Sequence, residues 1–532
     1  MTDRVYLYDT TLRDGQQTQG VQFSASEKVE IAQMLDTLGL DYIEGGWPGA
    51  NPTDSEFFQA APNTAATMTA FGMTKRVGRS AANDDVLAAV TNAGTGAVCL
   101  VGKTHVTHVE KALGVSREEN VAAIQDSIAH LVSLGREALF DAEHFFDGYA
   151  RDPGYAVTCL KAAYDAGARW IVLCDTNGGT MPDRIGAIVA DVIAAGIPGD
   201  RLGIHTHNDT EQAVAGSLAA VLAGARQIQG TLNGLGERCG NANLTSLIPT
   251  LALKEPFAST VQIGVPQDAL ATLLRVSRRL DDILNRVPRR EAAYVGASAF
   301  AHKAGLHASA VAKDPRLYEH VPPDTVGNAR IVPMSNQAGL SNLRARLAHT
   351  GLSGTDAELR AILDEVKRRE DRGYTYDGAQ ASFEVLARRM LGQLPEFFEV
   401  KRYRVTVERR KNKRDDMISL SEAVVVVKID GEKRMSVSDS LESGADAGPV
   451  NALSKALRKD LGRWQAQIDD MSLVDFRVRI MQGGTEAVTR VIIDHEDAAG
   501  HRWSTVGVSA NIVDASFEAL LDAIRWKLVQ GT

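Results

Sequence analysis

The strongest constraint on the fold is a strand-then-helix pattern that recurs eight times between the start of the chain and about residue 255. Short apolar runs alternate with longer segments of helical periodicity, several of which end at a glycine. Eight such units in about 250 residues are typical of a (β/α)8 barrel. The strand candidates are Val5–Tyr8, Asp41–Glu44, Thr67–Phe71, Ala97–Val101, Glu137–Ala142, Trp170–Cys174, Leu202–Thr206 and Arg226–Gly230.

An open, doubly wound α/β sheet is the alternative to this barrel. It would need no eighth strand, and no glycine-rich phosphate-binding turn follows the first strand candidate. We therefore expect an α/β protein whose TIM barrel occupies residues 1–265, with its first helix from Ser26 to Leu38. The chain has 532 residues, which leaves room for further domains after the barrel. We expect a mostly helical linker region over residues 266–397 and a separate α+β domain over 398–532.

The C-terminal region contains an internal repeat. The sequence EAVVVVKID at Glu422–Asp430 matches EAVTRVIID at Glu486–Asp494. Each copy follows one strand candidate and precedes another strand and a helix, so the pattern predicts two βββα units in tandem. One such unit cannot bury a sheet face alone. We therefore expect the two units to pack on one another or on a second subunit.

Composition and charge exclude several classes of partner. The chain has 44% hydrophobic and 23% charged residues, which is typical of a globular protein. Its formal net charge of −9 argues against nucleic acid or an anionic membrane as partner. No apolar run reaches the ~18 residues of a membrane helix, and no signal peptide is recognisable. The four cysteines form no CxxC pair. From this cysteine usage we expect a cytoplasmic protein.

Polar residues follow many of the strand candidates, and in a barrel these would gather on one rim, where barrel enzymes hold their catalytic groups. His205 and His207 are two positions apart on a strand, so they share a face, and two such imidazoles suit a divalent metal. Two structural histidines are the alternative for an isolated pair. Asp14, expected on the same rim, would be a third ligand, and Asn241 could add an amide oxygen. This donor set leaves Zn²⁺, Mn²⁺ and Mg²⁺ open.

Arg13 lies beside Asp14 in the sequence, and alone this pair could be a surface ion pair. Next to a metal, the Arg13 guanidinium could instead stabilise an enolate or alkoxide oxygen. Glu44 and Glu143 could hold Arg13 or a substrate in place, or form ordinary buried salt bridges. Thr176 could donate a hydrogen bond to a substrate carboxylate, or cap the end of its strand.

Three motifs together resemble those of the DRE-TIM metallolyase superfamily: DTTLRDGQQ at Asp9–Gln17, HTHND at His205–Asp209 and GLGERCGN at Gly234–Asn241. Within it, the chain resembles the branch that joins acetyl-CoA to a 2-oxo acid, the 2-isopropylmalate, homocitrate and citramalate synthases. The stretches Tyr42–Pro52 and His302–His307 are most similar to those of the citramalate synthases.

The resemblance implies an acyltransferase that performs a metal-assisted Claisen condensation of acetyl-CoA with pyruvate, giving (R)-citramalate and CoA in isoleucine biosynthesis. The alternatives are 2-isopropylmalate synthase, which uses 2-oxoisovalerate, and homocitrate synthase, which uses 2-oxoglutarate. The resemblance also implies that Asp14, His205 and His207 bind the metal, with Asn241 close by, and that Arg13 stabilises the enolate oxygen.

Three further roles follow from the resemblance alone. Glu143 and Thr176 would contact the 2-oxo acid. His307 resembles the histidine proposed to assist deprotonation of the acetyl methyl group, although the residues alone also allow a structural role at a helix start. Arg330 is a departure, because other synthases of the branch carry a tyrosine near this position. The identity of the general base therefore stays open.

The C-terminal repeat resembles the allosteric domain of the isopropylmalate and citramalate synthases. This implies an amino-acid effector, isoleucine, bound between the two units, and a homodimer; a role in dimerisation alone is the alternative. Two other functions remain open: a lyase that cleaves an acyl-CoA, and a non-catalytic metal-binding regulator. The long repeat counts against the lyase, and the intact Arg13, Asp14 and histidine pair count against the regulator.

Overall fold

The computed structural model describes residues 3–60, 62–303, 305–331, 340–411, 417–441, 448–481 and 488–531. The chain divides into two compact units. The first comprises Met1–Phe300 and Val321–Ala329, and the second comprises Ala301–His320 and Arg330–Thr532. None of the helices in the described ranges is long and apolar enough to cross a membrane.

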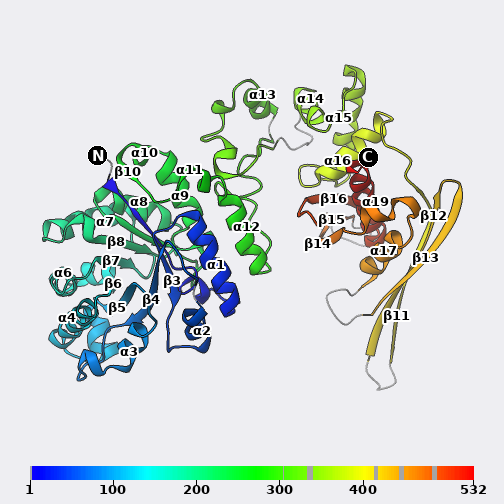
Figure 1. Ribbon diagram of the computed structural model, residues 1–532. Helices are drawn as coiled ribbons and strands as arrows, with labels where there is room; N and C mark the ends of the chain where they lie inside the picture. Colours follow the sequence, from blue (N-terminus) through cyan, green and yellow to red (C-terminus); the bar gives the residue numbers. More distant parts are fainter. Residues whose placement is uncertain are drawn as a thin grey trace. The chain divides into compact units, whose positions relative to one another are not determined.

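The first unit contains a closed barrel of parallel strands in sequence order, in which β2 pairs with both β3 and β9 (Figure 1). The predicted barrel is thus confirmed, and the open sheet is excluded because the ends of the sheet pair with each other. The strands are β2 (Tyr6–Asp9), β3 (Tyr42–Gly46), β4 (Thr67–Met73), β5 (Ala97–Lys103), β6 (Glu137–Glu143), β7 (Trp170–Asp175), β8 (Leu202–Thr206) and β9 (Gln227–Gly230).

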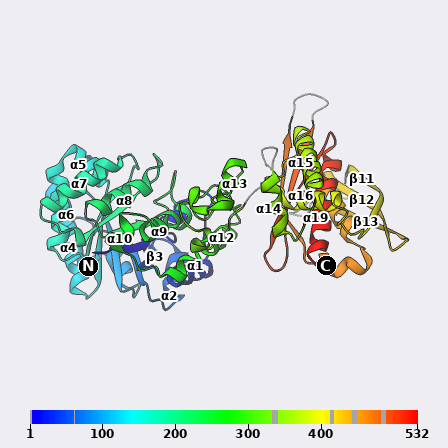
Figure 2. The ribbon, with the colours of Figure 1, turned by 90° about the horizontal axis from the view of Figure 1, so that it is seen from above.

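Helices lie outside these strands and bury their apolar faces against them (Figure 1, Figure 2). The first begins earlier than predicted, because the Ser24 side chain accepts a hydrogen bond from the Glu27 amide and forms a capping box. The helices of this unit are α1 (Ala25–Leu38), α2 (Pro52–Ala60), α3 (Asp85–Thr91), α4 (Arg117–Ser133), α5 (Phe145–Arg151), α6 (Pro153–Asp165), α7 (Pro182–Ala194), α8 (Ala213–Ala223), α9 (Leu244–Leu253), α10 (Phe257–Thr260), α11 (Gln267–Leu270) and α12 (Leu273–Ile283).

The inside of the barrel is filled rather than hollow. Tyr8, Tyr42, Phe71 and Trp170 belong to one buried cluster within it. The Trp170 indole donates to the Tyr42 hydroxyl at 3.1 Å, so even the polar atoms of this cluster are satisfied internally. A packed interior leaves the loops at the strand ends as the place for chemistry. The short strand β1 (Asp3–Arg4) pairs with β10 (Val261–Gln262) outside the barrel.

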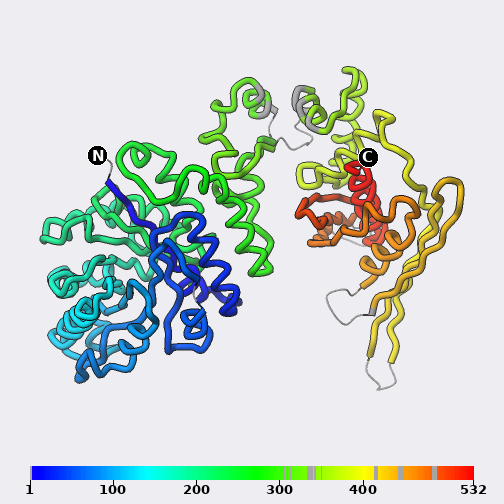
Figure 3. Tube along the Cα trace, viewed as in Figure 1, coloured from blue at the N-terminus to red at the C-terminus, as the bar shows by residue number. Residues whose placement is uncertain are grey.

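The second unit starts with helices and ends with two three-stranded antiparallel sheets, each followed by a helix (Figure 3). The predicted βββα repeat is confirmed; Glu486 and Ala487 of its second copy lie outside the described residues. The elements are α13 (Gly305–Lys313), α14 (Leu340–His349), α15 (Asp356–Asp371), α16 (Gln380–Met390), β11 (Glu399–Lys411), β12 (Met417–Ile429), β13 (Glu432–Leu441), α17 (Pro449–Arg458), α18 (Gln465–Ile468), β14 (Ser472–Ile480), β15 (Thr489–Glu496), β16 (Arg502–Ser509) and α19 (Ile512–Gln530).

The two repeat units share one hydrophobic core. Val425 and Val427 on alternate positions of β12, Val491 and Ile493 on β15, and the inner faces of α17 and α19 all belong to the same buried cluster. The strict alternation of buried and less buried residues along β12 shows that one sheet face is buried there. The units therefore pack on one another, which is one of the two arrangements that the repeat allowed.

Candidate active site

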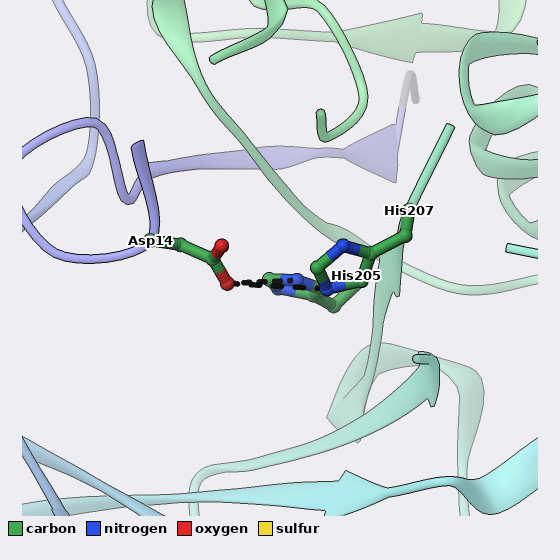
Figure 4. A group of neighbouring side chains, drawn as sticks. All are labelled: Asp14, His205 and His207. Atoms are coloured by element: carbon green, nitrogen blue, oxygen red, sulfur yellow. Dashed lines mark ion pairs between the residues drawn. The ribbon is translucent and has the colours of Figure 1, made fainter. Parts of the chain in front are cut away.

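Three predicted metal ligands meet on the barrel rim. Asp14 follows β2, His205 lies in β8, and His207 comes directly after β8. The Oδ2 atom of Asp14 lies 3.5 Å from Nε2 of His205 and 4.0 Å from Nε2 of His207 (Figure 4). All three side chains are buried, and their nearest ligand atoms lie within 4.8 Å of one another. Within the described ranges, this is the one group of three or more such side chains that could hold a metal ion.

The spacing and the chemistry of this group fit a divalent cation. The distances from Asp14 to the two imidazoles are too long for hydrogen bonds. They are close to the span of about 3 Å or more between two ligands that each bond one cation at about 2.1 Å. Asn241 donates from Nδ2 to Asp14 Oδ1 at 3.0 Å, while its own Oδ1 is buried and has no hydrogen-bond partner among the described residues. A buried oxygen without a hydrogen-bond partner destabilises the folded protein, and coordination to a cation would provide the missing partner.

The protonation states also suit metal binding. Burial lowers the pKa of His207 to about 4, helped by the neighbouring His205, so the His207 imidazole is neutral at pH 7. Burial alone would raise the pKa of Asp14, but Arg13 and the two histidines outweigh it and lower this pKa to about 2. Neutral imidazole and ionised carboxylate are the forms that coordinate a metal.

His205 is held by two residues that the sequence analysis did not single out. Its Nδ1 lies 2.8 Å from Oε1 of Gln229 in β9, and Gln229 Nε2 donates to Asp141 Oδ1 in β6 at 3.0 Å. Burial raises the pKa of Asp141. The signal was present in the sequence: β9 reads Gln-Ile-Gln-Gly, and Gln229 is a polar residue in a strand that is buried at every position.

Arg13 is partly buried next to the candidate metal ligands, with 12% of its side chain exposed, and its pair with Asp14 is not on the surface. Its Nη1 donates to Asp14 Oδ2 at 3.0 Å and its Nε to Glu44 Oε2 at 2.7 Å. The guanidinium carbon lies 3.9 Å from the centre of the Phe71 ring. Burial opposes the charge on Arg13, but Glu44 and Asp14 outweigh it and raise the pKa of the guanidinium. The side chain is therefore a fixed positive charge.

Glu44 is completely buried and is surrounded by protein donors. Its Oε1 accepts from the Tyr8 hydroxyl at 2.5 Å, and its Oε2 accepts from Thr10 Oγ1 at 2.5 Å and from Arg13. Both carboxylate oxygens are thus engaged within the protein, and the contact that Glu44 makes toward the site is its ion pair with Arg13.

Glu143 and Thr176 lie at the ends of the neighbouring strands β6 and β7. Glu143 forms an ion pair with Lys103 at the end of β5. The Thr176 hydroxyl accepts a hydrogen bond from the backbone amide of His144 at 2.8 Å. His144 has a φ of 55°, a left-handed conformation that is uncommon for a residue with a Cβ and is found enriched at functional sites.

A buried ion pair between Lys28 and Asp54 supports the loop that carries Arg13 and the strand β3 that carries Glu44. Lys28 Nζ donates to the carbonyl oxygens of Leu12 at 2.8 Å and Gly45 at 3.1 Å. Each of these carbonyls is one residue away from a site residue. This pair cannot be recognised in the sequence, because a lysine within an amphipathic helix gives no sign that it points inward.

His307, the remaining predicted site residue, belongs to the second unit. It lies in α13, is exposed, and its ring stacks on that of Tyr318 with 4.2 Å between the centroids. Arg330, the departure noted in the sequence, is paired with Glu319 at 2.5 Å. Ala304, within the predicted motif, lies outside the described residues. The role of His307 toward the barrel stays a prediction.

Three family models match successive parts of the chain. The HMGL-like model matches residues 4–276, the homocitrate synthase post-HMGL domain-like model matches 294–374, and the LeuA allosteric (dimerisation) domain model matches 377–528. The first match spans the barrel with all three clustered side chains.

Curated relatives match over the whole length. The (R)-citramalate synthase of Aquifex aeolicus is 44% identical over 100% of this chain and 99% of its own, and that of Streptomyces coelicolor is 42% identical over 100% and 98%. A probable 2-isopropylmalate synthase of Methanopyrus kandleri is 32% identical over 99% and 98%. The chain therefore belongs to the HMGL-like family and, within it, to the (R)-citramalate synthases, which are enzymes.

Proposed function

We propose that this enzyme condenses acetyl-CoA with pyruvate, with the help of a divalent metal, to give (R)-citramalate and CoA. The observation that carries the proposal is the buried group of Asp14, His205 and His207 next to the partly buried guanidinium of Arg13. The 44% identity to an (R)-citramalate synthase, against 32% to a probable 2-isopropylmalate synthase, favours pyruvate as the 2-oxo acid.

The metal would be held by Asp14, His205 and His207, with the amide oxygen of Asn241 as a fourth donor. A bound Zn²⁺, Mn²⁺ or Mg²⁺ supplies a Lewis acid that polarises the keto group of the 2-oxo acid. Arg13 acts on the other reactant. A base removes a proton from the acetyl methyl group, and the Arg13 guanidinium stabilises the negative charge on the resulting enolate oxygen.

Arg13 suits this task because its position is fixed before substrate binds. Glu44, Asp14 and the face of Phe71 hold the guanidinium from different sides. Donors that need no reorganisation during the reaction stabilise a developing charge most effectively. The enolate carbon then bonds to the keto carbon of pyruvate, and water cleaves the thioester to release CoA.

Thr176 and Glu143 would bind the 2-oxo acid, and Glu44 would serve the same substrate-binding region by holding Arg13. The Thr176 hydroxyl already accepts a hydrogen bond from the His144 amide, so its own proton can be donated to a substrate carboxylate. The family resemblance assigns to His307 assistance in the deprotonation of acetyl-CoA.

We assign residues 1–265 to catalysis, residues 266–397 to a linker region that contributes to the active site, and residues 398–532 to regulation. The LeuA match at 377–528 supports a regulatory, dimer-forming role for the C-terminal part. We propose that isoleucine binds there and inhibits the enzyme, that the protein is a cytoplasmic homodimer, and that it acts in isoleucine biosynthesis.

The test is an assay of thiol release from acetyl-CoA with a panel of 2-oxo acids. The proposal predicts the highest kcat/KM for pyruvate. A preference for 2-oxoisovalerate would indicate a 2-isopropylmalate synthase, and a preference for 2-oxoglutarate a homocitrate synthase. Absence of CoA release with every 2-oxo acid, in the presence of Mn²⁺, Mg²⁺ or Zn²⁺, would contradict the proposal.

A further inference from the structure

The tautomer of His205 decides whether it can coordinate a cation at the site. A neutral imidazole carries one proton, and only the unprotonated nitrogen has a lone pair for a metal. In the structure Nε2 faces Asp14 Oδ2 at 3.5 Å (Figure 4). For His205 to be a ligand there, its proton must lie on Nδ1.

The orientation of the Gln229 amide supplies that condition. Its Nε2 lies 3.0 Å from Asp141 Oδ1 and donates to it. With the Asp141 carboxylate ionised, the flipped amide would place two oxygens that only accept hydrogen bonds against each other at this distance. The Oε1 atom must therefore face His205 Nδ1, which lies 2.8 Å away. An amide oxygen only accepts hydrogen bonds, so it requires the proton on Nδ1.

The three side chains in this chain of contacts are shielded from bulk water. Asp141, Gln229 and His205 are 3%, 1% and 5% exposed, so bulk water does not replace a lost partner. The three side chains come from β6, β9 and β8, three strands of one closed barrel. Their relative positions are therefore set by the barrel itself rather than by loops.

We propose that Gln229, oriented by Asp141, is a positioning residue that fixes His205 in the Nδ1-protonated tautomer and so prepares its Nε2 for a divalent cation. The inference rests on the proposed function, because it assumes that His205 binds the metal. Removing the partner of a metal-ligating histidine typically weakens metal binding by about 10–100-fold.

The test is the dissociation constant of Mn²⁺, measured by calorimetry on the metal-free, full-length protein. Gln229→Leu is expected to bind Mn²⁺ about 10–100-fold more weakly than the wild type. Gln227→Leu is a matched control: Gln227 is buried two positions earlier in the same strand, and its side chain has no hydrogen-bond partner among the described residues. This control is expected to keep the wild-type Mn²⁺ affinity.

A double variant tests the chain of contacts itself. Gln229→Glu alone places a carboxylate against Asp141 and is expected to weaken Mn²⁺ binding. Adding Asp141→Asn restores a donor opposite the introduced carboxylate, which can again accept the proton of His205 Nδ1. The double variant is therefore expected to recover most of the affinity that Gln229→Glu loses, which a general packing effect would not produce.

The outcomes separate this inference from the proposed function. Thermal unfolding confirms that each variant is folded, and His205→Ala reports whether His205 binds the metal at all. If His205→Ala keeps the wild-type affinity, the proposed metal site itself fails. If His205→Ala loses Mn²⁺ while folded Gln229→Leu binds it like the wild type, or if Gln227→Leu loses as much as Gln229→Leu, the positioning role of Gln229 is overturned.

Discussion

Arg13 and Glu44 form a partly buried ion pair in which Nε donates to Oε2 at 2.7 Å, and the Glu44 side chain is completely enclosed. The pair joins the loop after β2 to strand β3, so the charge assigned to the enolate is held by the barrel wall. Its other contact, with Asp14, places that charge directly beside the candidate metal ligands. In the proposed mechanism, the two halves of the condensation would depend on adjacent residues of one loop.

Arg13→Lys should lower kcat by about 10²–10³-fold, the usual effect of losing one donor to a developing oxyanion. Lysine keeps the positive charge, but it lacks the planar guanidinium that contacts Glu44, Asp14 and the face of Phe71 at the same time. Steady-state release of CoA measures the effect, and the Mn²⁺ dissociation constant is the control. A kcat within about twofold of the wild type would show that the guanidinium geometry is not needed.

Lys28→Met should destabilise the protein by about 3–5 kcal/mol, because it leaves the buried Asp54 carboxylate without its cation. Combining it with Asp54→Asn removes the uncompensated charge and should restore part of that loss. Urea unfolding of the two variants provides the comparison. If the double variant is less stable than Lys28→Met alone, the ion pair is not the cause.

Asp9 should make stability depend on pH, since burial raises its pKa from 3.8 to about 7. The folded state then holds a proton that the unfolded chain has lost, so this contribution is fully present below pH 4 and is lost as the pH rises through 7. Replacing Asp9 with Asn removes it. The free energy of unfolding of Asp9→Asn should gain about 2 kcal/mol relative to the wild type between pH 5 and 7.

Urea unfolding at pH 5, 6, 7 and 8 measures this difference. Effects of other titrating groups cancel, because both proteins carry them. A difference between the two proteins that stays constant across these pH values would mean that Asp9 has an ordinary pKa in the folded state.

Isoleucine should lower the rate of CoA release by the full-length enzyme, with leucine and valine as controls. Allosteric couplings of about 1–3 kcal/mol correspond to changes of about 5–150-fold. The experiment belongs on the full chain, because α16 is bound to β16 and α19 of the C-terminal repeat: Val506 donates to Ser382 Oγ at 3.0 Å and Trp526 donates to Glu384 at 2.8 Å. Equal responses to the three amino acids, or none, would count against isoleucine as the effector.

The sequence predicts the barrel and the grouping of Asp14, His205 and His207 because both depend on local patterns. Eight apolar runs set the strands, and His205 and His207 share a face by the two-residue period of a strand. Asp14 follows because the ends of parallel strands meet on one rim. The start of α1 was one position off, since Ser24 and Ser26 are equally good N-cap residues until Glu27 is seen to pair with Ser24.

The supporting contacts could not be predicted in the same way. Gln229 reaches Asp141 across the barrel, and Lys28 reaches Leu12 and Asp54 beneath the loops. These contacts join residues far apart in the sequence, and a single glutamine or lysine in an apolar run does not indicate which residue it contacts. Only the closed barrel brings them together.

The most direct test of the account is the pyruvate-dependent release of CoA from acetyl-CoA by the wild-type and Asp14→Ala proteins, each assayed after chelation and again after Mn²⁺ is returned. The account predicts that the wild type loses activity on chelation and regains it with Mn²⁺, whereas Asp14→Ala stays inactive and binds no Mn²⁺. Full activity of the chelated wild type, or wild-type turnover by Asp14→Ala, would contradict it.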